Sequence, residues 1–398
     1  MPHPMRSKIF VLTLLLGCLL MFNPVGLDMF LPAVPNIARG LDTTSNQIMN
    51  SMSALFFGNA IGRLVLGPLA DRYGRKPIIL LTLIIFTCSA FASSLASSIE
   101  FFIFFRFIQG FSIAGGHVFS LSVARDLFEK EQLGKIIANA TAIMGLAGIF
   151  FPILGGQMVQ FMPWQSIFWV MSIFGLTVFS FVIVSYKETI KQKNPRAVNP
   201  RFLLQNWFKI ITDPVFLCYA LCSSFVSAGF FAYVTVSPTV LREILGVSAL
   251  DYGLSFAFLA FSFVISNLIA GQLIARIGQS FLLGIGGAMA VLGAGMMLGF
   301  SVMGIDRPFA IIIPTAIYFF AIGWIVPQSN ALALQPFEYS AGTASALLGF
   351  ISMVVSAFTG FLLSFAVHDD ATYLALSMLL SSFSSFLIYF LLIQKILK

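Results

Sequence analysis

Long apolar runs separated by short polar breaks divide the 398-residue chain into twelve segments. Each is about as long as the roughly 20 apolar residues that a helix needs to cross a bilayer. The runs lie at 9–35, 47–66, 77–95, 99–123, 134–159, 164–186, 214–237, 251–274, 279–301, 307–329, 343–366 and 372–395. No barrel-like alternation is present, and a backbone in lipid must satisfy its polar groups internally. The pattern predicts an all-α membrane protein with twelve transmembrane helices.

The longest polar break, at 187–211, separates two halves that repeat each other. GPLADRYGRK at 67–76 is echoed by GQLIARIGQS at 271–280, and a shift of 204 positions superposes Gly67 on Gly271. We therefore expect an N-terminal six-helix bundle at 1–186, a linker at 187–211 and a C-terminal six-helix bundle at 212–398. Such pseudo-symmetric repeats place the substrate site between the halves, near the middle of the membrane, and rock around it.

The basic residues predict the orientation. Of the 22 Lys and Arg residues, Arg39, Arg242 and Arg307 fall on one side, and Arg63 and Arg106 fall inside apolar runs. The other seventeen lie on the side that holds the linker and the ends of the chain. Because basic loops stay in the cytoplasm, we expect both termini and the linker to be cytoplasmic.

Composition excludes a water-soluble domain. Hydrophobic residues make up 59% of the chain, charged residues only 9%, and the mean hydropathy is +0.96, whereas soluble domains carry roughly 25% charged residues. The net charge of +7 sits in loops on one side, so we expect no nucleic-acid partner. All four cysteines lie in apolar runs, with no disulfide framework and no metal-ligand spacing. We expect neither a metal nor a cofactor.

Several motifs resemble one transporter family in order and spacing. GPLADRYGRK at 67–76 is similar to the loop signature of the major facilitator superfamily, and RFIQG at 106–110 resembles a motif of its proton-coupled members. GLAG at 145–148 and PILGG at 152–156 resemble the drug-antiporter motif. The segments that resemble the twelve-span Bcr/CflA drug:proton antiporters are DMFLPAVP at 28–35, RDLF at 125–128 and GTASALLG at 342–349.

This resemblance implies a monomeric proton-coupled secondary transporter in the inner membrane of a bacterium. It would export drugs or other small lipophilic or amphipathic compounds by alternating access, driven by the proton gradient, with protons, the small-molecule substrate and the lipid bilayer as its partners. An alternative is a siderophore or another metabolite, exported or taken up by the same fold. An enzyme would need a clustered nucleophile, metal ligands or several acids, which three scattered histidines do not supply. A channel would be expected to oligomerise around a polar pore.

Asp28 and Arg106 are the candidates for proton coupling. A carboxylate inside a span is costly unless it is paired, hydrated or protonated, so it can carry a proton. Both residues fall roughly 10 Å below the outer surface at 1.5 Å per residue, so we expect Arg106 to pair with Asp28 directly or through water. The alternatives are a helix-end acid tied to backbone or headgroups, and a purely structural arginine.

Other polar residues in the spans are candidates for the substrate cavity. Gln109 and Gly110 follow Arg106 at the next turn, and His117 lies three turns further along that face, where it either relays protons or is hydrogen-bonded to its neighbours. The second half carries no mid-membrane charge, so its wall is apolar. Its polar candidates are Tyr233, Tyr318, Trp324, Gln328 and Asn330.

The loop between the second and third spans is the candidate for conformational gating. We expect Asp71 to dock at the helix N-terminus near Gly342, where a negative charge is favoured, and Arg75 to reach Asp126. The alternative is a topology determinant only. The residues in this proposed lock are Gly67, Asp71, Arg72, Gly74, Arg75, Lys76, Asp126 and Gly342.

The fifth span combines small residues with a proline. Small side chains let helices approach closely, and a proline bends the helix. We expect this span to shape the interface between the halves through Gly145, Gly148, Pro152, Gly155 and Gly156. Phe151 and Arg63 depart from the family pattern, because relatives often carry a small residue and a neutral glutamine there. We expect Arg63 to extend toward the cytoplasm.

Overall fold

The computed structural model describes residues 3–128, 130–190, 192–364 and 371–393, which form helices and turns without a strand. The first half contains α1 His3–Leu20, α2 Phe22–Leu27, η1 Leu31–Ala33, α3 Val34–Gly40, α4 Ser45–Tyr73, α5 Arg75–Ser94, α6 Ile99–Leu127, α7 Lys130–Phe161 and α8 Gln165–Ser185. The linker holds α9 Pro200–Ile211. The second half contains α10 Pro214–Ser237, η2 Pro238–Ile244, α11 Ala249–Ile277, α12 Gln279–Val302, α13 Pro308–Leu334, η3 Gln335–Ser340, α14 Ala341–Ser364, α15 Thr372–Ile388 and η4 Tyr389–Ile393.

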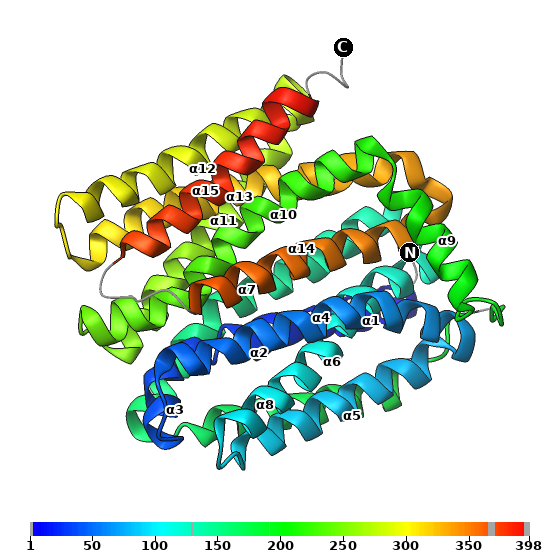
Figure 1. Cartoon of the computed structure of the whole chain (residues 1–398). Coiled ribbons are helices and arrows are strands. Elements are labelled where there is room, and N and C mark those ends of the chain that lie inside the picture. Colours follow the sequence, from blue (N-terminus) through cyan, green and yellow to red (C-terminus); the bar gives the residue numbers. More distant parts are fainter. Residues whose placement is uncertain (1–2, 129, 191, 365–370, 394–398) are drawn as a thin grey trace.

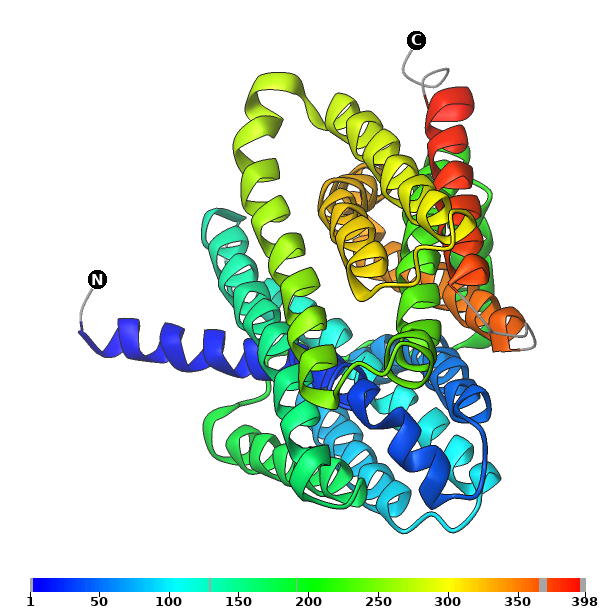
Figure 2. The ribbon, with the colours of Figure 1, turned by 90° about the vertical axis from the view of Figure 1, so that its left-hand side faces the viewer.

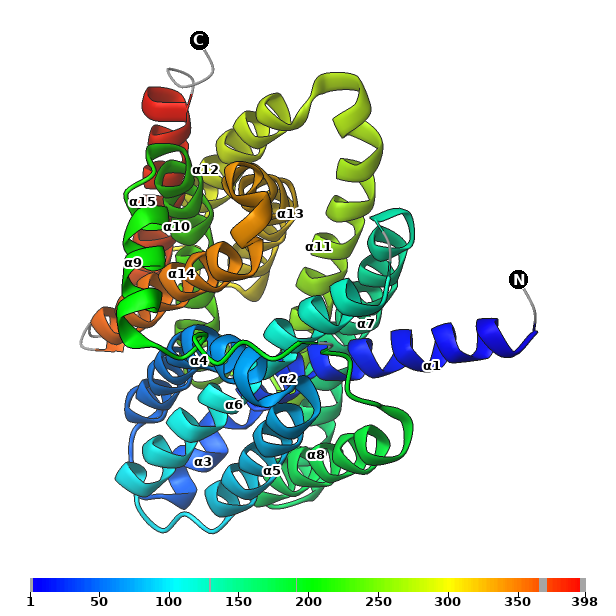
Figure 3. The same ribbon diagram turned by 90° about the vertical axis from the view of Figure 1, so that its right-hand side faces the viewer.

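Within the described residues, twelve helical segments are long and apolar enough to cross a membrane. Figures 2 and 3 show helices α2 to α8 gathered in one bundle and α10 to α15 in the other, with α1 joined to the first bundle and its beginning projecting sideways. The predicted all-α fold of twelve spans in two six-helix bundles is therefore confirmed. Phe10, Phe104 and Leu268 are examples of large apolar side chains that remain exposed. Such a surface suits lipid rather than water.

The helices extend beyond the apolar runs where polar ends continue the helical hydrogen bonding. The second span was expected at 47–66, but α4 runs from Ser45 to Tyr73 and is capped by the Thr44 side chain, which accepts a hydrogen bond from Gln47 N. It ends at Gly74, whose φ of 114° lies in the region that favours glycine. Hydropathy detects the lipid-crossing part of a helix, whereas caps decide where the helix ends.

The first span is not the continuous helix that its apolar run predicts. It breaks after Leu27 and again around Leu31, in a stretch that contains three prolines at positions 24, 32 and 35. Proline lacks the N–H that continues a helix, and its ring clashes with the preceding turn. The break places irregular backbone and Asp28 inside the protein, where neighbouring helices cover them.

The two bundles meet along two helix pairs, α4 with α14 and α7 with α11. In Figure 1, α4 and α14 lie side by side, and α9 lies at the same end of the molecule as the N-terminus. We call this end, which carries the linker, the linker end, and the other the distal end. Helix α9 exposes the apolar residues Phe202, Leu204 and Phe208, an arrangement typical of a helix lying in a membrane interface.

Candidate functional site: a cavity between the two halves

A cavity of about 860 Å³ lies between the two bundles. Its walls come from α1, α4, α6 and α7 on one side and α10, α11, α13 and α14 on the other. Asp126, Asn194 and Trp207 also line it, so the cavity reaches the linker end. Phe230, Phe231 and Phe263 contribute apolar wall. Pockets of this size with a largely apolar lining and a few polar groups are typical of small-molecule sites.

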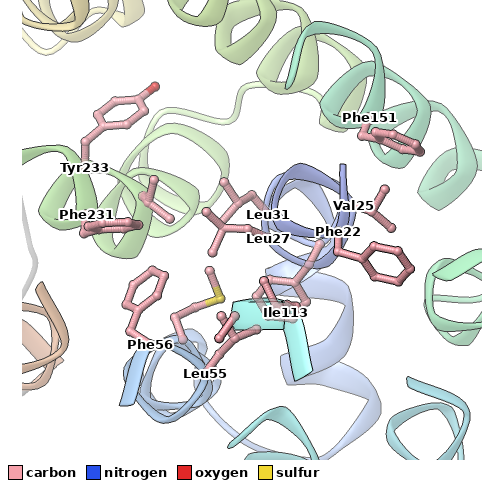
Figure 4. Close-up of a cluster of buried hydrophobic side chains, with 14 of the residues drawn as sticks. Phe22, Val25, Leu27, Leu31, Leu55, Phe56, Ile113, Phe151, Phe231 and Tyr233 are labelled. Carbon is pink, nitrogen blue, oxygen red and sulfur yellow. The ribbon is translucent and has the colours of Figure 1, made fainter. Parts of the chain in front are cut away.

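The distal end of the cavity is closed by aromatic and aliphatic side chains. Phe56 of α4 and Phe231 of α10 meet with ring centroids 4.2 Å apart, one from each half. Figure 4 shows these two rings facing each other, with Leu27 and Leu31 packed beside them. A pair of aromatic rings contributes about 0.5–1.5 kcal/mol beyond the area that it buries. The contact closes the path from the cavity to the distal end.

Polar contacts between the halves support this closure further out. Ser45 Oγ donates to Glu243 Oε1 over 2.6 Å. Arg242 Nη1 donates to the Pro32 carbonyl oxygen and to Asn36 Oδ1. These residues join the distal ends of α3 and α4 to η2, so the halves are tied together where the cavity is closed. The sequence analysis considered Arg242 only among the basic residues that predict the orientation.

The fifth span has the geometry expected of an interface helix. A Cβ added to Gly155 would overlap the Met29 carbonyl oxygen, and one added to Gly156 would overlap the Ala249 carbonyl oxygen of α11. In return, Gly253 of α11 packs directly against the Pro152 carbonyl group. Helices α7 and α11 therefore approach backbone to backbone, which only glycine permits.

Arg106 is fully buried and does not pair with Asp28. Its Nη1 donates to the Gly26 carbonyl oxygen over 2.9 Å and to Gln109 Oε1 over 2.7 Å. Its guanidinium carbon lies 4.5 Å from the centroid of the Phe30 ring. The expected direct pair is therefore wrong, because the break after Leu27 offers a backbone acceptor and an aromatic face instead. Arg106 nevertheless lies at the same depth as Asp28, because Asp28 follows its acceptor Gly26 by two residues.

Asp28 is 8% exposed and lies where the first half meets the second. Its Oδ2 is 3.8 Å from the position that a Cβ on Gly148 would take. No hydrogen bond or ion pair to its carboxylate occurs among the described residues. A buried carboxylate without a partner is costly in its charged form, so this carboxyl group can bind a proton. Among the described residues, no backbone group bonds to this carboxylate as it would to a helix cap.

His117 and Arg63 face the cavity together. Arg63 does not extend out to the cytoplasm as expected: its Nε donates to Asn59 Oδ1 over 2.9 Å, and its guanidinium lies against Gly349 of the opposite half. Within the described chain, His117 forms no hydrogen bond, so of its two readings the one in which neighbours hydrogen-bond it is wrong. The cavity supplies open space in place of the protein partners that a packed helix face would offer.

Of the residues expected around the substrate, His117 and Asn330 line the cavity and the others lie elsewhere. The Tyr318 hydroxyl donates to the Val226 carbonyl oxygen, and Trp324 Nε1 donates to the Ser266 carbonyl oxygen, both inside the second bundle. Four others are buried in packing contacts. Gln109 lies beside Arg106 and Gly110 lies against Leu55, and the side chains of Tyr233 and Gln328 are also buried. Inside a protein, polar side chains turn toward backbone acceptors, and sequence does not show which face those occupy.

The loop after α4 carries a charge network at the mouth of the cavity. Arg75 pairs with Asp71 over 2.8 Å and with Asp126 of α6 over 3.2 Å, so the expected contact with Asp126 is present. Lys76 Nζ donates to the Tyr186 carbonyl oxygen. Arg72 lies over the Tyr73 ring, and Gly67 lines the cavity.

Asp71 does not dock at the start of α14. Its partner is Arg75, and nothing lies within 4 Å of the position that a Cβ on Gly342 would take. Both Asp71 and Gly342 line the cavity. The cavity separates the halves at this end, which leaves the expected lock open.

Glu188 is a member of this network that sequence reasoning missed. Its carboxylate accepts hydrogen bonds from the backbone N–H groups of Arg75 and Lys76, at the start of α5, and of Thr189 and Ile190. Partial burial acts to raise the pKa of Glu188, but these N–H donors outweigh it and leave the pKa below its ordinary value. An acid capping a helix N-terminus is favourable, but the distance in sequence between Glu188 and α5 hides it.

Comparisons with known proteins also match this chain to membrane transporters. A family model described as the Major Facilitator Superfamily matches residues 16–360. A bicyclomycin resistance protein homolog from Haemophilus influenzae is 32% identical, and the match covers 99% of this chain and 98% of the relative. The multidrug resistance protein MdtL of Salmonella paratyphi A is 27% identical, with 83% and 82% covered.

Solved structures share the fold at low identity. A D-xylose–proton symporter superposes with a TM-score of 0.75 at 15% identity, covering 95% of this chain and 97% of the symporter. A bacterial homolog of the human lysosomal transporter Spinster, in an inward-facing and occupied conformation, gives 0.74 at 17% identity, with 98% and 97% covered.

Proposed function

This chain belongs to the major facilitator superfamily, and we propose that it is a proton-coupled exporter of small amphipathic compounds in the inner membrane of a bacterium. It is a multi-pass membrane transporter and not an enzyme. Drug-resistance relatives, among them the bicyclomycin resistance homolog, support the export of drugs. The enclosed, unpartnered carboxyl group of Asp28, at the junction of the two bundles, is the observation that carries the proton coupling.

The cavity gives this proposal a direction. If the basic linker end faces the cytoplasm, as the positive residues predict, a cavity open there and closed distally is the inward-facing state. A cytoplasmic compound then enters the cavity at the linker end. Rocking of the bundles around α4–α14 and α7–α11 moves the opening to the distal end. In that outward-facing state Asp71 would contact the start of α14, which it does not reach here.

The proton follows the same alternation. Asp28 lies between α2 and α7, outside the cavity lining, in a position that closure of the halves covers. In the outward-facing state it would be hydrated and bind a proton, and burial would keep the carboxyl group protonated during the return. With Arg106 held by backbone and aromatic partners, the carboxyl group is the titrating member, and one proton per cycle is the simplest stoichiometry.

The test is compound-induced proton movement in inverted membrane vesicles that contain the protein, followed with a pH-sensitive dye. The panel contains neutral, cationic and anionic antibiotics. We expect at least one compound to release protons through the wild-type protein and none to do so through Asp28→Asn. Asp42→Asn is the matched control, because Asp42 is exposed in a distal loop. Proton movement that persists in Asp28→Asn would contradict the assigned role of this carboxyl group.

A further inference from the structure

The deep part of the cavity holds positive charge without an acidic counterpart. The acidic residues in its lining are Asp71 and Asp126, both at the linker-end mouth and both bound to Arg75. Arg63 lies eight residues before Asp71 on α4, about 12 Å further in at 1.5 Å per residue. His117 is its neighbour in the lining. Asp28 is not in the lining, so no carboxylate of the described wall reaches this depth.

The guanidinium of Arg63 has free hydrogen-bonding capacity. Nε is used by Asn59 Oδ1, whereas Nη1 and Nη2 form no hydrogen bond or ion pair within the described residues. A guanidinium presents its donors in a planar fork that matches a carboxylate or phosphate. Arg63 is half-buried in the cavity wall, and an incoming anion would supply acceptors for the donors that remain free.

Gly349 makes this position possible. A Cβ there would lie 2.7 Å from Arg63 Cδ and 3.0 Å from Cζ, and would overlap Nη1. Glycine thus admits the guanidinium of the first half into the wall of the second. Asn330, Ser227, Phe230 and Phe263 line the same cavity and add polar and apolar surface to its wall.

We infer that Arg63 binds an anionic group, such as a carboxylate or sulfonate, of an amphipathic substrate whose apolar part packs on the phenylalanines. This rests on the proposed function and specifies its substrate class. Lipophilic cations are disfavoured, because the deep cavity repels them. The substrate charge and the proton occupy different places, since Asp28 lies outside the cavity. A membrane potential that is negative inside also favours the exit of an anion.

Two dyes of nearly the same shape and opposite charge provide the test. Fluorescein is anionic at neutral pH, and rhodamine 123 carries the same tricyclic core as a cation. Binding of each to the detergent-purified protein is measured by fluorescence anisotropy, with protein-free micelles as the blank. We expect the wild-type protein to bind fluorescein at least tenfold more tightly than rhodamine 123. Hydrogen bonds to charged groups set this scale.

Variants separate Arg63 from general electrostatics. We expect Arg63→Gln to weaken fluorescein binding roughly 10- to 100-fold and to leave rhodamine 123 unchanged or tighter. Gly349→Ala should weaken fluorescein binding without changing the charge. Arg125→Gln, which removes one positive charge at the exposed mouth of the cavity, should change it less than about threefold because salt screens exposed charges. The fluorescein affinity of Arg63→Lys should lie between those of wild type and Arg63→Gln. Elution of this variant as a single monodisperse peak in size-exclusion chromatography checks that it folds.

Several outcomes would overturn the inference. They are equal binding of the two dyes to the wild-type protein, no fluorescein binding up to millimolar concentration, or equal losses in Arg63→Gln and Arg125→Gln. The assay needs no proton gradient, so its failure is distinct from failure of the proposed function. A wild-type protein that exports rhodamine 123 with Asp28-dependent proton movement would refute the anion site alone. Fluorescein binding without compound-driven proton movement would refute the coupling alone.

Discussion

A single methyl group at Gly156 should shift the balance between the two states of this transporter. In the present state, a Cβ on Gly156 would lie 3.0 Å from the Ala249 carbonyl carbon and 3.1 Å from Leu250 Cα. Ordinary carbon contacts are about 3.5–4.0 Å, so α7 and α11 would have to separate by roughly half an ångström or more. Both neighbours are backbone atoms, which cannot turn aside as a flexible side chain can.

The size of the shift follows from this overlap. Inserting a methylene into a close-packed interface costs about 1–3 kcal/mol, which changes an equilibrium constant by a factor of roughly 5 to 150. Because the distal ends separate in the outward-facing state, the cost falls on the state with the distal end closed. If wild type populates both states equally, the closed fraction should fall to below about a fifth. Transport should slow, since each cycle passes through the disfavoured state.

The assay is a distance distribution between spin labels on the two distal loops. Ser97 and Met303 are exposed there, one in each half, and cysteines at these positions carry the labels in a background without the four native cysteines. Gly134→Ala is the matched control on the same helix, because nothing lies within 4 Å of the Cβ that it adds. We expect Gly156→Ala to populate longer distances and Gly134→Ala to match wild type. Indistinguishable distributions and transport rates in the two variants would refute the reasoning.

Two further predictions concern charged residues outside the cavity. Arg106→Lys should reduce transport about tenfold or more, because an ammonium cannot hold the Gly26 carbonyl, Gln109 and the Phe30 face together; transport at the wild-type rate would exclude a need for the guanidinium. Glu188→Gln should lower thermal stability at pH 7 by about 0.5–1 kcal/mol at most, since the carboxylate is exposed. The folded pKa of Glu188 lies below its ordinary value, so this stabilisation is present above about pH 4.3 and is lost as the pH falls through the folded pKa. Melting curves at pH 7 and near pH 3 check this, and an unchanged difference between wild type and variant at the lower pH would contradict it.

Sequence alone determined the class, the number of spans and the repeat. Twelve apolar runs can satisfy their backbone groups only as helices in lipid, so periodicity and length suffice there. The glycines of the fifth span were also recognised from sequence, because a small residue in an apolar helix permits close approach of a neighbour wherever that neighbour lies. The contact of Arg75 with Asp126, which joins two motifs 51 positions apart, was also predicted.

Tertiary structure decided which polar groups meet. Arg106 was expected at Asp28 but bonds to Gly26, because the break in the first span exposes a carbonyl that no hydropathy pattern reveals. Arg63 was expected to extend toward the cytoplasm, yet Gly349, distant in the sequence, receives it in the opposite bundle. Glu188 caps a helix that begins more than 100 positions earlier. A side chain's partner depends on the rotation of each helix and on the gap between the bundles, and long-range packing alone sets both.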